Sequence, residues 1–213
     1  MDAGEPGIVR AIASIGAIAV VAALLVSSSY ELSRDRIEEN RRERLLRSLD
    51  AVIGSIVYDN DLAASRITVI DTELLGSSAP IDVFVARRNG APVAALFASV
   101  APRGYNGPIR LLVGIATDGH VTGVRVTDHN ETPGLGDSIE LGRSNWILGF
   151  DGRTLTSPTP AGWAVVPDGG VFDSITGATV TPRAVVKSVR DTLTYFDRDR
   201  DAIFSARPES GDE

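Results

Sequence analysis

An apolar segment near the N-terminus places the strongest constraint on how this chain folds. Residues 8–30 are apolar or small except for Arg10, and the run from Ala11 to Val26 contains no charged residue. A helix of this length reaches about 34 Å, enough to cross a hydrocarbon core of about 30 Å. The segment therefore predicts a transmembrane helix over residues 8–30, with residues 1–7 as a short N-terminal tail.

A cleaved signal peptide is the alternative interpretation of this segment. Ser27 and Ser29 would supply small residues before a cleavage point. The residues before the apolar run, however, are poor in positive charge and include Asp2 and Glu5. A retained membrane anchor is the favoured interpretation.

The charges that follow the apolar segment bear on its orientation. Between Glu31 and Asp50 lie six arginines and six acidic residues, whereas only Arg10 and the amino terminus are positive on the other side. The positive-inside rule counts Lys and Arg and gives acidic residues little weight, so by itself it predicts that the C-terminal part is cytoplasmic.

Composition excludes several classes of function. The 213 residues are 43% hydrophobic and 23% charged, which is typical of a chain with a real core. A net charge of −7 argues against nucleic-acid binding. The chain has no cysteine, which excludes disulfides, thiolate nucleophiles and cysteine-ligated clusters, and two histidines are too few for a metal cage built from protein alone.

The remaining sequence predicts an α+β fold with an antiparallel sheet. Residues 31–78 are expected to form a helical connector, helical to about Ile56 and broken at Asp59-Asn60-Asp61. Residues 79–206 are expected to form the main domain and residues 207–213 a polar tail. Strands are expected at 81–86, 92–100, 109–117, 121–127 and 163–166, followed by a helix from Pro182 to about Phe204.

A short motif precedes this last helix. Thr176-Gly177-Ala178-Thr179 brings three small residues and a hydroxyl to a helix start at which Thr181 is expected to cap and Pro182 suits the first turn. The N–H groups of a helix N-terminus favour a phosphate near Thr179. The alternative is an ordinary glycine turn before a capped helix.

A second unusual stretch runs from Asp128 to Asp137. Pro133, Gly134 and Gly136 within four residues indicate special backbone dihedrals or close approach of a ligand. The alternative is a long turn that closes the sheet, with Trp146 and Phe150 filling the core beyond it.

Together these motifs resemble the FMN-binding domain family, in which the [ST]-G-A-[ST] signature carries FMN through a phosphoester to its last residue, here Thr179. The Glu131–Gly136 loop resembles the ETPGLG loop found in the G subunit of the Rnf/Rsx electron transport complex, and in the C subunit of the sodium-pumping NADH:quinone oxidoreductase. The sequence after Asp137 is closer to the Rnf/Rsx pattern. The resemblance implies a mixed α/β FMN-binding domain behind the anchor, with the Glu131–Gly136 loop against the isoalloxazine. The residues assigned to the flavin site are Thr179, Thr176, Gly177, Ala178, Glu131, Thr132, Gly134 and Leu135, with Asp173 and Thr176 expected to position the attachment reaction. Lys187 is a candidate to face the phosphate, together with Arg183 one turn away on the helix. The alternative is that both belong to a solvated face.

The function implied by the resemblance is electron transfer between ferredoxin and NAD, coupled to ion translocation, within a membrane complex. Expected partners are the other membrane and redox subunits and a flavin transferase that uses FAD, with no nucleic acid. The expected location is the bacterial inner membrane, with the flavin domain on the periplasmic side. This orientation is opposite to the one that the arginine count predicts. Large domains translocate largely regardless of charge, which favours the family orientation. The corresponding quinone-reductase subunit and a membrane-anchored flavin sensor are the alternatives.

Overall fold

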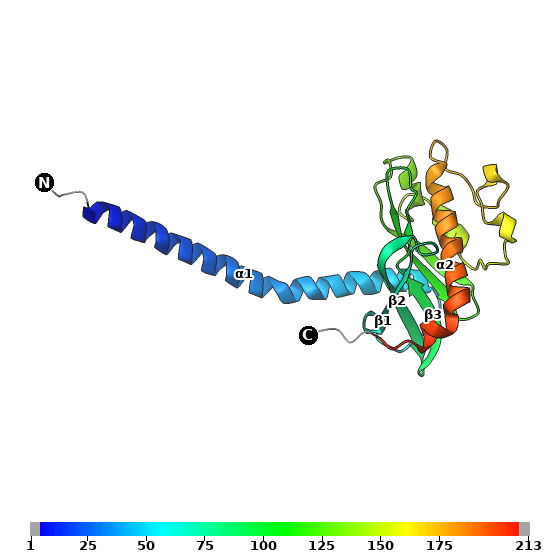
Figure 1. The fold of residues 1–213 in the computed structure, drawn as a ribbon, viewed down its shortest axis with the longest axis horizontal. Helices are drawn as coiled ribbons and strands as arrows, with labels where there is room; N and C mark the ends of the chain where they lie inside the picture. The colour runs from blue at the N-terminus through cyan, green and yellow to red at the C-terminus, as the bar shows by residue number, and fades with distance from the viewer. Residues whose placement is uncertain (1–4, 209–213) are drawn as a thin grey trace. The chain divides into compact units, whose positions relative to one another are not determined.

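The computed structural model describes residues 5–208, and the chain forms two compact units, residues 1–44 and residues 45–213. Residues 1–4 of the expected N-terminal tail and 209–213 of the expected polar tail lie outside the described residues. Helix α1 (Glu5–Ile53) makes up the described part of the first unit and its last residues belong to the second (Figure 1).

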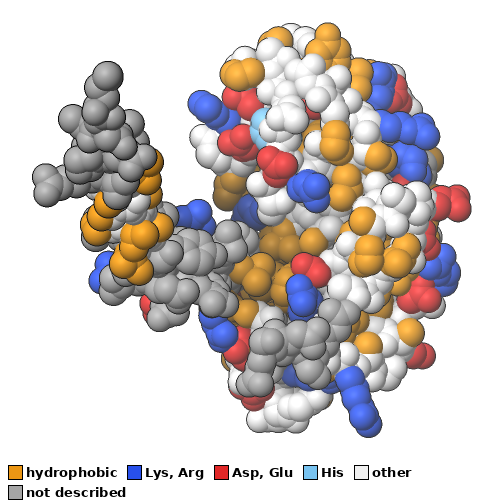
Figure 2. Space-filling model, turned by 60° about the vertical axis from the view of Figure 1, so that its left-hand side comes forward, with side chains coloured by type: hydrophobic (Ala, Val, Ile, Leu, Met, Phe, Trp, Pro, Cys, Tyr) orange, Lys and Arg blue, Asp and Glu red, His pale blue; other side chains and the backbone are white. Residues whose placement is uncertain are grey.

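The first unit exposes apolar side chains. Residues 12–24 of α1 are all exposed, and Figure 2 shows hydrophobic side chains on this described stretch. The large ones are Ile12, Ile15, Ile18, Val20, Val21 and Leu24. No helix in the described part of the chain has the length and apolar character needed to span a membrane. The side chains at both ends of the expected 8–30 segment, residues 8–11 and 25–30, lie outside those described.

The second unit is built on a six-stranded sheet in which every strand pairing is antiparallel. Strand β5 is central, because β3 and β4 pair with one of its edges and β6 with the other. Strands β2 and β1 extend the sheet beyond β3. The strands are β1 (Arg66–Asp71), β2 (Ser77–Arg88), β3 (Ala91–Phe97), β4 (Val100–Ala101), β5 (Ile109–Ala116) and β6 (Val121–Asp128).

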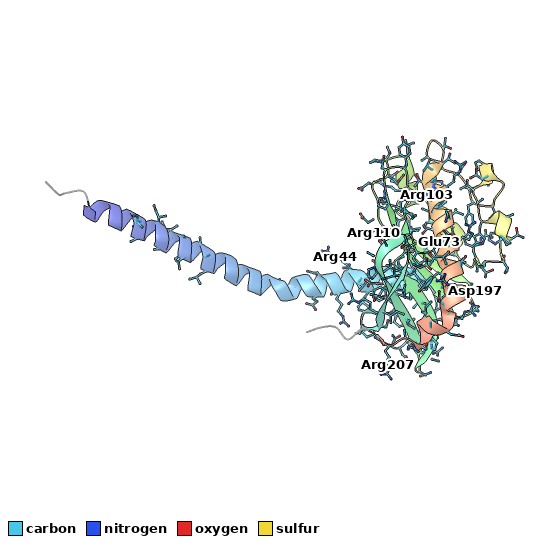
Figure 3. The ribbon with its side chains drawn as sticks, in the orientation of Figure 1. Arg44, Glu73, Arg103, Arg110, Asp197 and Arg207 are labelled. Atoms are coloured by element: carbon cyan, nitrogen blue, oxygen red, sulfur yellow. The ribbon has the colours of Figure 1, made fainter. Side chains whose placement is uncertain are left out.

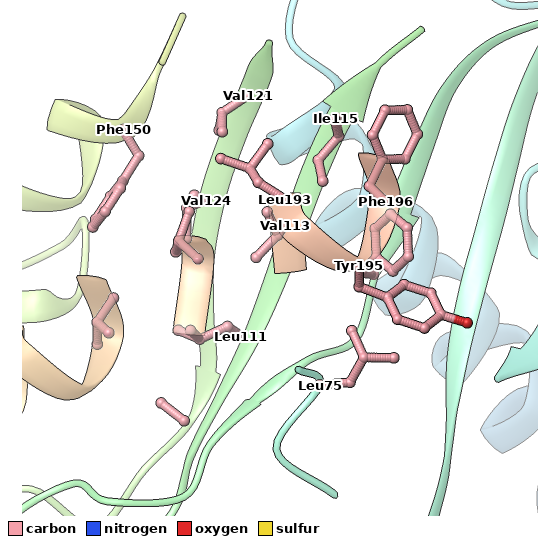
Figure 4. Packing of buried hydrophobic residues seen from close by; sticks show 14 of the residues in the cluster. Leu75, Leu111, Val113, Ile115, Val121, Val124, Phe150, Leu193, Tyr195 and Phe196 are labelled. Carbon is pink, nitrogen blue, oxygen red and sulfur yellow. The ribbon is translucent and has the colours of Figure 1, made fainter. Parts of the chain in front are cut away.

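Both faces of the sheet are covered, and the alternation along β5 shows how. Leu111, Val113 and Ile115 belong to the core that the sheet shares with helix α2 (Val180–Ser205). Figure 4 shows Leu193 and Phe196 of α2 among these strand residues. Leu112 belongs instead to a second core on the other face, together with Leu49, Val52 and Ile53 from the end of α1. This period of two is what a strand buried on both faces requires.

The end of α1 lies very close to the sheet because two glycines face it. Gly114 and Gly123 are cross-strand partners on β5 and β6. A Cβ on Gly114 would lie 2.6 Å from the Val52 carbonyl oxygen, and one on Gly123 would lie 3.0 Å from Val52 Cα. Thr122 donates a hydrogen bond of 2.5 Å from its Oγ1 to the Val52 carbonyl oxygen. A carbonyl at the helix end, left without a helical N–H partner, is therefore satisfied by the sheet.

The structure corrects the expected elements in three places. The 31–78 connector is helical only to Ile53, and its later part contains β1 and the start of β2. β1 is a short strand that pairs with β2, the next strand along the chain, in an antiparallel hairpin. The expected strand 92–100 ends at Phe97, and pairing with β5 resumes at β4.

The third correction concerns residues 163–166, which do not form a strand. Residues 163–165 lie between the short 3₁₀ helices η4 (Pro160–Gly162) and η5 (Val166–Asp168), and Val166 is the first residue of η5. Val165 makes an isolated parallel bridge with Phe172. Pro160 and Pro167 lack the N–H groups that a strand ladder needs, which explains why this apolar stretch stays irregular. Two further 3₁₀ helices, η2 (Gly136–Ile139) and η3 (Trp146–Phe150), lie between β6 and this region, and a fifth, η1 (Ala63–Ser65), precedes β1.

The contact between α1 and the sheet yields a stability prediction. Gly114→Ala should lower the free energy of unfolding by about 1–3 kcal/mol, because the added methyl group meets backbone that has no room to move. The measurement is urea denaturation of the full chain in detergent, followed by circular dichroism. Gly149→Ala is the matched control, since a Cβ there meets nothing within 4 Å, and it should not lower the free energy of unfolding.

Candidate functional site

The Thr176–Thr179 motif and the Glu131–Gly136 loop lie side by side. The Thr181 hydroxyl, two residues after Thr179, donates a buried hydrogen bond to Oε2 of Glu131. A Cβ on Gly177 would lie 3.3 Å from Cδ2 of Leu135. The fold therefore brings the start of α2 and the loop into contact although they are far apart in the sequence.

Glu131 is the centre of this contact. It is 5% exposed, and its Oε1 accepts a hydrogen bond of 3.1 Å from the backbone N–H of Asn106. Gly104 and Gly136 pack against the carboxylate so closely that a Cβ on either would lie 2.7 or 2.8 Å from one of its oxygens. The absence of side chains at these two positions makes room for the carboxylate.

The segment 104–107 belongs to the site, although its sequence predicts only a turn. Besides its backbone bond to Glu131, Asn106 donates from Nδ2 to Oγ1 of Thr132 over 3.1 Å. Tyr105 beside it is 67% exposed. The sequence signal for this segment was a pair of glycines, Gly104 and Gly107, around Asn106. The same pattern is typical of an ordinary surface turn, so the sequence could not distinguish a site segment from a turn.

Helix α2 begins two residues earlier than expected, which changes the roles of the two threonines. It starts at Val180, and Thr179 occupies the N-cap position without making a side-chain capping hydrogen bond. Thr181 was expected to cap the helix; that expectation is wrong, because its hydroxyl is fully buried and bonds to Glu131. Thr179 itself is half-buried, and its hydroxyl is not engaged in capping.

The residues around Thr179 fit a phosphate-linked flavin. The first N–H groups of an α-helix have no partner within the helix, so they favour an anion at this end. Gly177 has a φ of +79° and Gly134 a φ of +77°, and a Cβ on Gly134 would meet nothing within 4 Å. Thr176, Gly177 and Leu135 are exposed, so a bulky group on Thr179 has open space beside it.

Lys187 and Arg183 are engaged with carboxylates. Lys187 lies about 12 Å along α2 from Thr179, at 1.5 Å per residue, and its Nζ pairs with Asp191. It lines a separate cavity of about 310 Å³ together with Glu73 and Arg103, both labelled in Figure 3. Arg183 makes two bonds to Asp168, of 2.5 and 2.6 Å.

An aromatic cluster holds the segment that leads into Thr176. Phe150 stacks on Phe172 with ring centroids 4.7 Å apart, and Trp146 packs edge-on against Phe150 at 5.4 Å. The Trp146 indole N–H donates 2.8 Å to the carbonyl oxygen of Asp173. Phe150 fills the core as expected, whereas Trp146 anchors the backbone of Asp173, whose side chain is exposed.

A polar cleft of about 640 Å³ lies beside the Glu131–Gly136 loop and is lined by His129, Glu131 and Glu140 among others. His129 accepts the backbone N–H of Glu131 at Nδ1 over 2.9 Å, and its Nε2 lies 2.6 Å from Oε1 of Glu140. Among the residues that the structure describes, no group of three or more His, Asp or Glu side chains is arranged to hold a metal ion.

Comparison with known proteins places these features in a family. Residues 104–194 match the model of the FMN-binding domain. The chain is 44% identical over 191 residues to the G subunit of the ion-translocating oxidoreductase complex of Pseudoalteromonas atlantica, covering 90% of this chain and 89% of that protein. It is 44% identical over 199 residues to the protein of the same name from Pseudomonas aeruginosa, covering 93% of each. This chain belongs to the G-subunit family of these complexes. A third relative, from Vibrio cholerae serotype O1, is 44% identical over 184 residues, covering 86% of this chain and 88% of that protein.

The region that matches the FMN-binding domain contains the candidate site. It begins at Gly104, so it includes the Asn106 segment, and it extends through most of α2. Both motifs and the hydrogen bonds between them therefore lie inside the matched region. The fold of this member of the G-subunit family is thus a mixed α/β FMN-binding domain with an antiparallel sheet.

The ion pair beside the start of α2 yields a prediction on pKa. Hydrogen bonding to Arg183 lowers the pKa of the Asp168 carboxyl below its ordinary value. Arg183→Ala should therefore raise the pKa of Asp168 back toward that value, as measured by NMR titration of its carboxyl carbon. Arg143→Ala, which removes an exposed arginine paired with Asp137, should leave the pKa of Asp168 unchanged.

The sign of the linked stability effect follows from this shift. A carboxyl with a lowered pKa in the folded state stabilises the protein above its unfolded pKa, and this contribution is lost as the pH falls through the folded pKa. Both side chains are exposed, so the effect on the free energy of unfolding should be small.

Proposed function

We propose that this chain is the flavoprotein subunit of an Rnf/Rsx-type membrane complex. In this role it carries electrons through FMN bound covalently at Thr179, in a path between ferredoxin and NAD that drives ion translocation. The observation that carries the proposal is the meeting of the two motifs, in which Gly177 lies against Leu135 and Thr181 bonds to Glu131. The names of its relatives favour this complex over the quinone reductase that carries a similar loop.

Thr179 is the proposed acceptor of the modification and takes no part in later turnover. Its Oγ attacks the flavin-side phosphorus of FAD, a P–O bond forms, the pyrophosphate bond breaks and AMP leaves with the bonding electron pair, while the hydroxyl proton is released. A separate flavin transferase catalyses this step. Thr176, Gly177, Ala178 and Asp173 shape the turn that the transferase must recognise.

The chain's own residues then hold the cofactor. The phosphoester keeps about one negative charge, which the helix N-terminus stabilises by roughly 0.3–1 kcal/mol at an exposed site. That energy orients the phosphate but cannot retain a flavin alone, so the covalent bond provides retention. Thr132, Gly134 and Leu135 offer a loop against which the ring can lie. Bound FMN supplies one- and two-electron transfer, and the chain has no cysteine that could do so.

We further propose that residues 8–30 anchor the protein in the bacterial inner membrane as a single transmembrane helix, with the flavin domain on the periplasmic side. Support comes from the uncharged run Ala11–Val26 and from the exposed apolar side chains of residues 12–24. Water would leave these side chains unfavourably hydrated, whereas lipid would bury them.

The attachment site can be tested by mutation. When the full chain is coexpressed with a flavin transferase, denatured protein should keep in-gel flavin fluorescence, and intact mass should show one FMN adduct that maps to the Thr179 peptide. Thr179→Ala should lose the adduct completely, because the acceptor oxygen is gone. Thr179→Ser should retain part of it.

Thr194→Ala is the matched control, since Thr194 is an exposed threonine on the same helix whose hydroxyl bonds to the Arg190 carbonyl oxygen. It should keep the full adduct. A covalent FMN that persists in Thr179→Ala would show that another residue is the acceptor.

The anchor can be tested separately. Membranes that contain the full chain should retain it through alkaline carbonate extraction, because an inserted helix is not released by charge repulsion or high pH. Recovery of the full chain in the soluble fraction would contradict the anchor. A reporter fused after Glu213 should show periplasmic exposure, and a cytoplasmic signal would show that the arginine count had predicted the orientation correctly.

A further inference from the structure

We infer that Glu131 is a positioning residue, which acts as a latch between the Glu131–Gly136 loop and the start of α2 and does not contact the flavin with its carboxylate. The inference rests on the proposed attachment of FMN at Thr179. The sequence resemblance groups Glu131 with the cofactor-binding residues, whereas its hydrogen bonds point to a different task.

Both oxygens of Glu131 are already occupied within the protein. Oε1 accepts from the N–H of Asn106 and Oε2 accepts from the hydroxyl of Thr181. The side chain is 5% exposed, and Gly104 and Gly136 close around it. Each oxygen of the carboxylate thus has a donor from a different segment, and only a small part of the side chain faces the cleft that Glu131 helps to line.

The latch joins three segments that the chain connects only over long distances. Asn106 lies between β4 and β5, Glu131 follows β6, and Thr181 lies in the first turn of α2. Asn106 also bonds to Thr132, so the loop is held at two successive residues. Thr181 follows Thr179 by two residues, which means that the latch fixes the attachment point relative to the loop.

Loss of the carboxylate would remove the acceptor of the Thr181 hydroxyl and of the Asn106 N–H. The Thr181 hydroxyl is fully buried, and an unsatisfied buried polar group is destabilising. The loop is expected to move away so that water can reach these donors. The flavin would stay attached at Thr179 but would no longer have an ordered surface beside it.

The conservative variant separates positioning from charge. In Glu131→Gln the amide oxygen can accept from the Asn106 N–H, and the amide NH₂ can donate to the Thr181 hydroxyl, which serves as acceptor as well as donor. This variant therefore keeps the latch and removes the charge. Glu131→Ala removes both, and Thr181→Val removes one of the two bonds while keeping the side-chain volume.

The experiment uses the full chain, coexpressed with a flavin transferase and purified in detergent. Intact mass of denatured protein gives the covalent FMN content, and the folded protein gives the visible spectrum, the flavin fluorescence anisotropy and the midpoint potential. Glu131→Gln should match wild type in all of these. Glu131→Ala should keep the adduct, lose anisotropy and shift its spectrum toward that of free FMN. Thr181→Val should change the anisotropy and the spectrum in the same direction, but by less. The Glu131→Ala/Thr181→Val double variant should be no worse than Glu131→Ala alone, because Glu131→Ala already removes the bond that Thr181→Val removes.

Three outcomes would overturn the latch. One is a Glu131→Gln variant as altered as Glu131→Ala, which would show that the charge itself acts on the flavin. Another is wild-type anisotropy and spectrum in Glu131→Ala. If Glu131→Ala fails to fold, wild-type behaviour of Thr181→Val would equally overturn it. Absence of an FMN adduct in the wild-type chain would instead contradict the proposed function, so the two failures are distinguishable.

Discussion

The first turn of α2 is joined to the loop after β6 by a buried hydrogen bond from the Thr181 hydroxyl to the Glu131 carboxylate. Much of the candidate site depends on this bond, because it sets where Thr179 stands relative to residues 131–136. A buried carboxylate is costly unless its oxygens find donors, and here the donors come from two other segments. The hydrogen bonds that stabilise the buried carboxylate therefore also hold the three segments of the site together.

The sheet provides the rigid support on which this assembly rests. α2 covers one face of the central strand β5, and the end of α1 covers the other. The glycine pair Gly114 and Gly123 allows α1 to approach so closely that Thr122 can bond to a carbonyl at the helix end. The last residues of α1, which belong to the second unit, are held on the sheet by backbone packing as well as by apolar burial.

Positive charge next to Thr179, the proposed attachment point, comes mainly from the backbone N–H groups at the start of α2. Lys187 and Arg183, the nearby cations on α2, are paired with Asp191 and Asp168. Acidic and basic side chains are interspersed over the face of the second unit seen in Figure 2. The helix N-terminus is thus the principal positive element next to Thr179, which suits a phosphoester with about one negative charge.

The sequence by itself determined the antiparallel α+β class, the terminal helix and the two motifs, because strand alternation, helical periodicity and glycine turns are local signals. Only the tertiary structure decided that the motifs touch, that Asn106 joins them, and that Thr181 serves the Glu131 latch instead of capping the helix. It also revealed β1, six residues that pair with the neighbouring strand β2. Hydrogen-bond partners of buried polar groups come from segments distant in sequence, so local pattern could name Glu131 and Thr181 but neither Asn106 nor the contacts among the three.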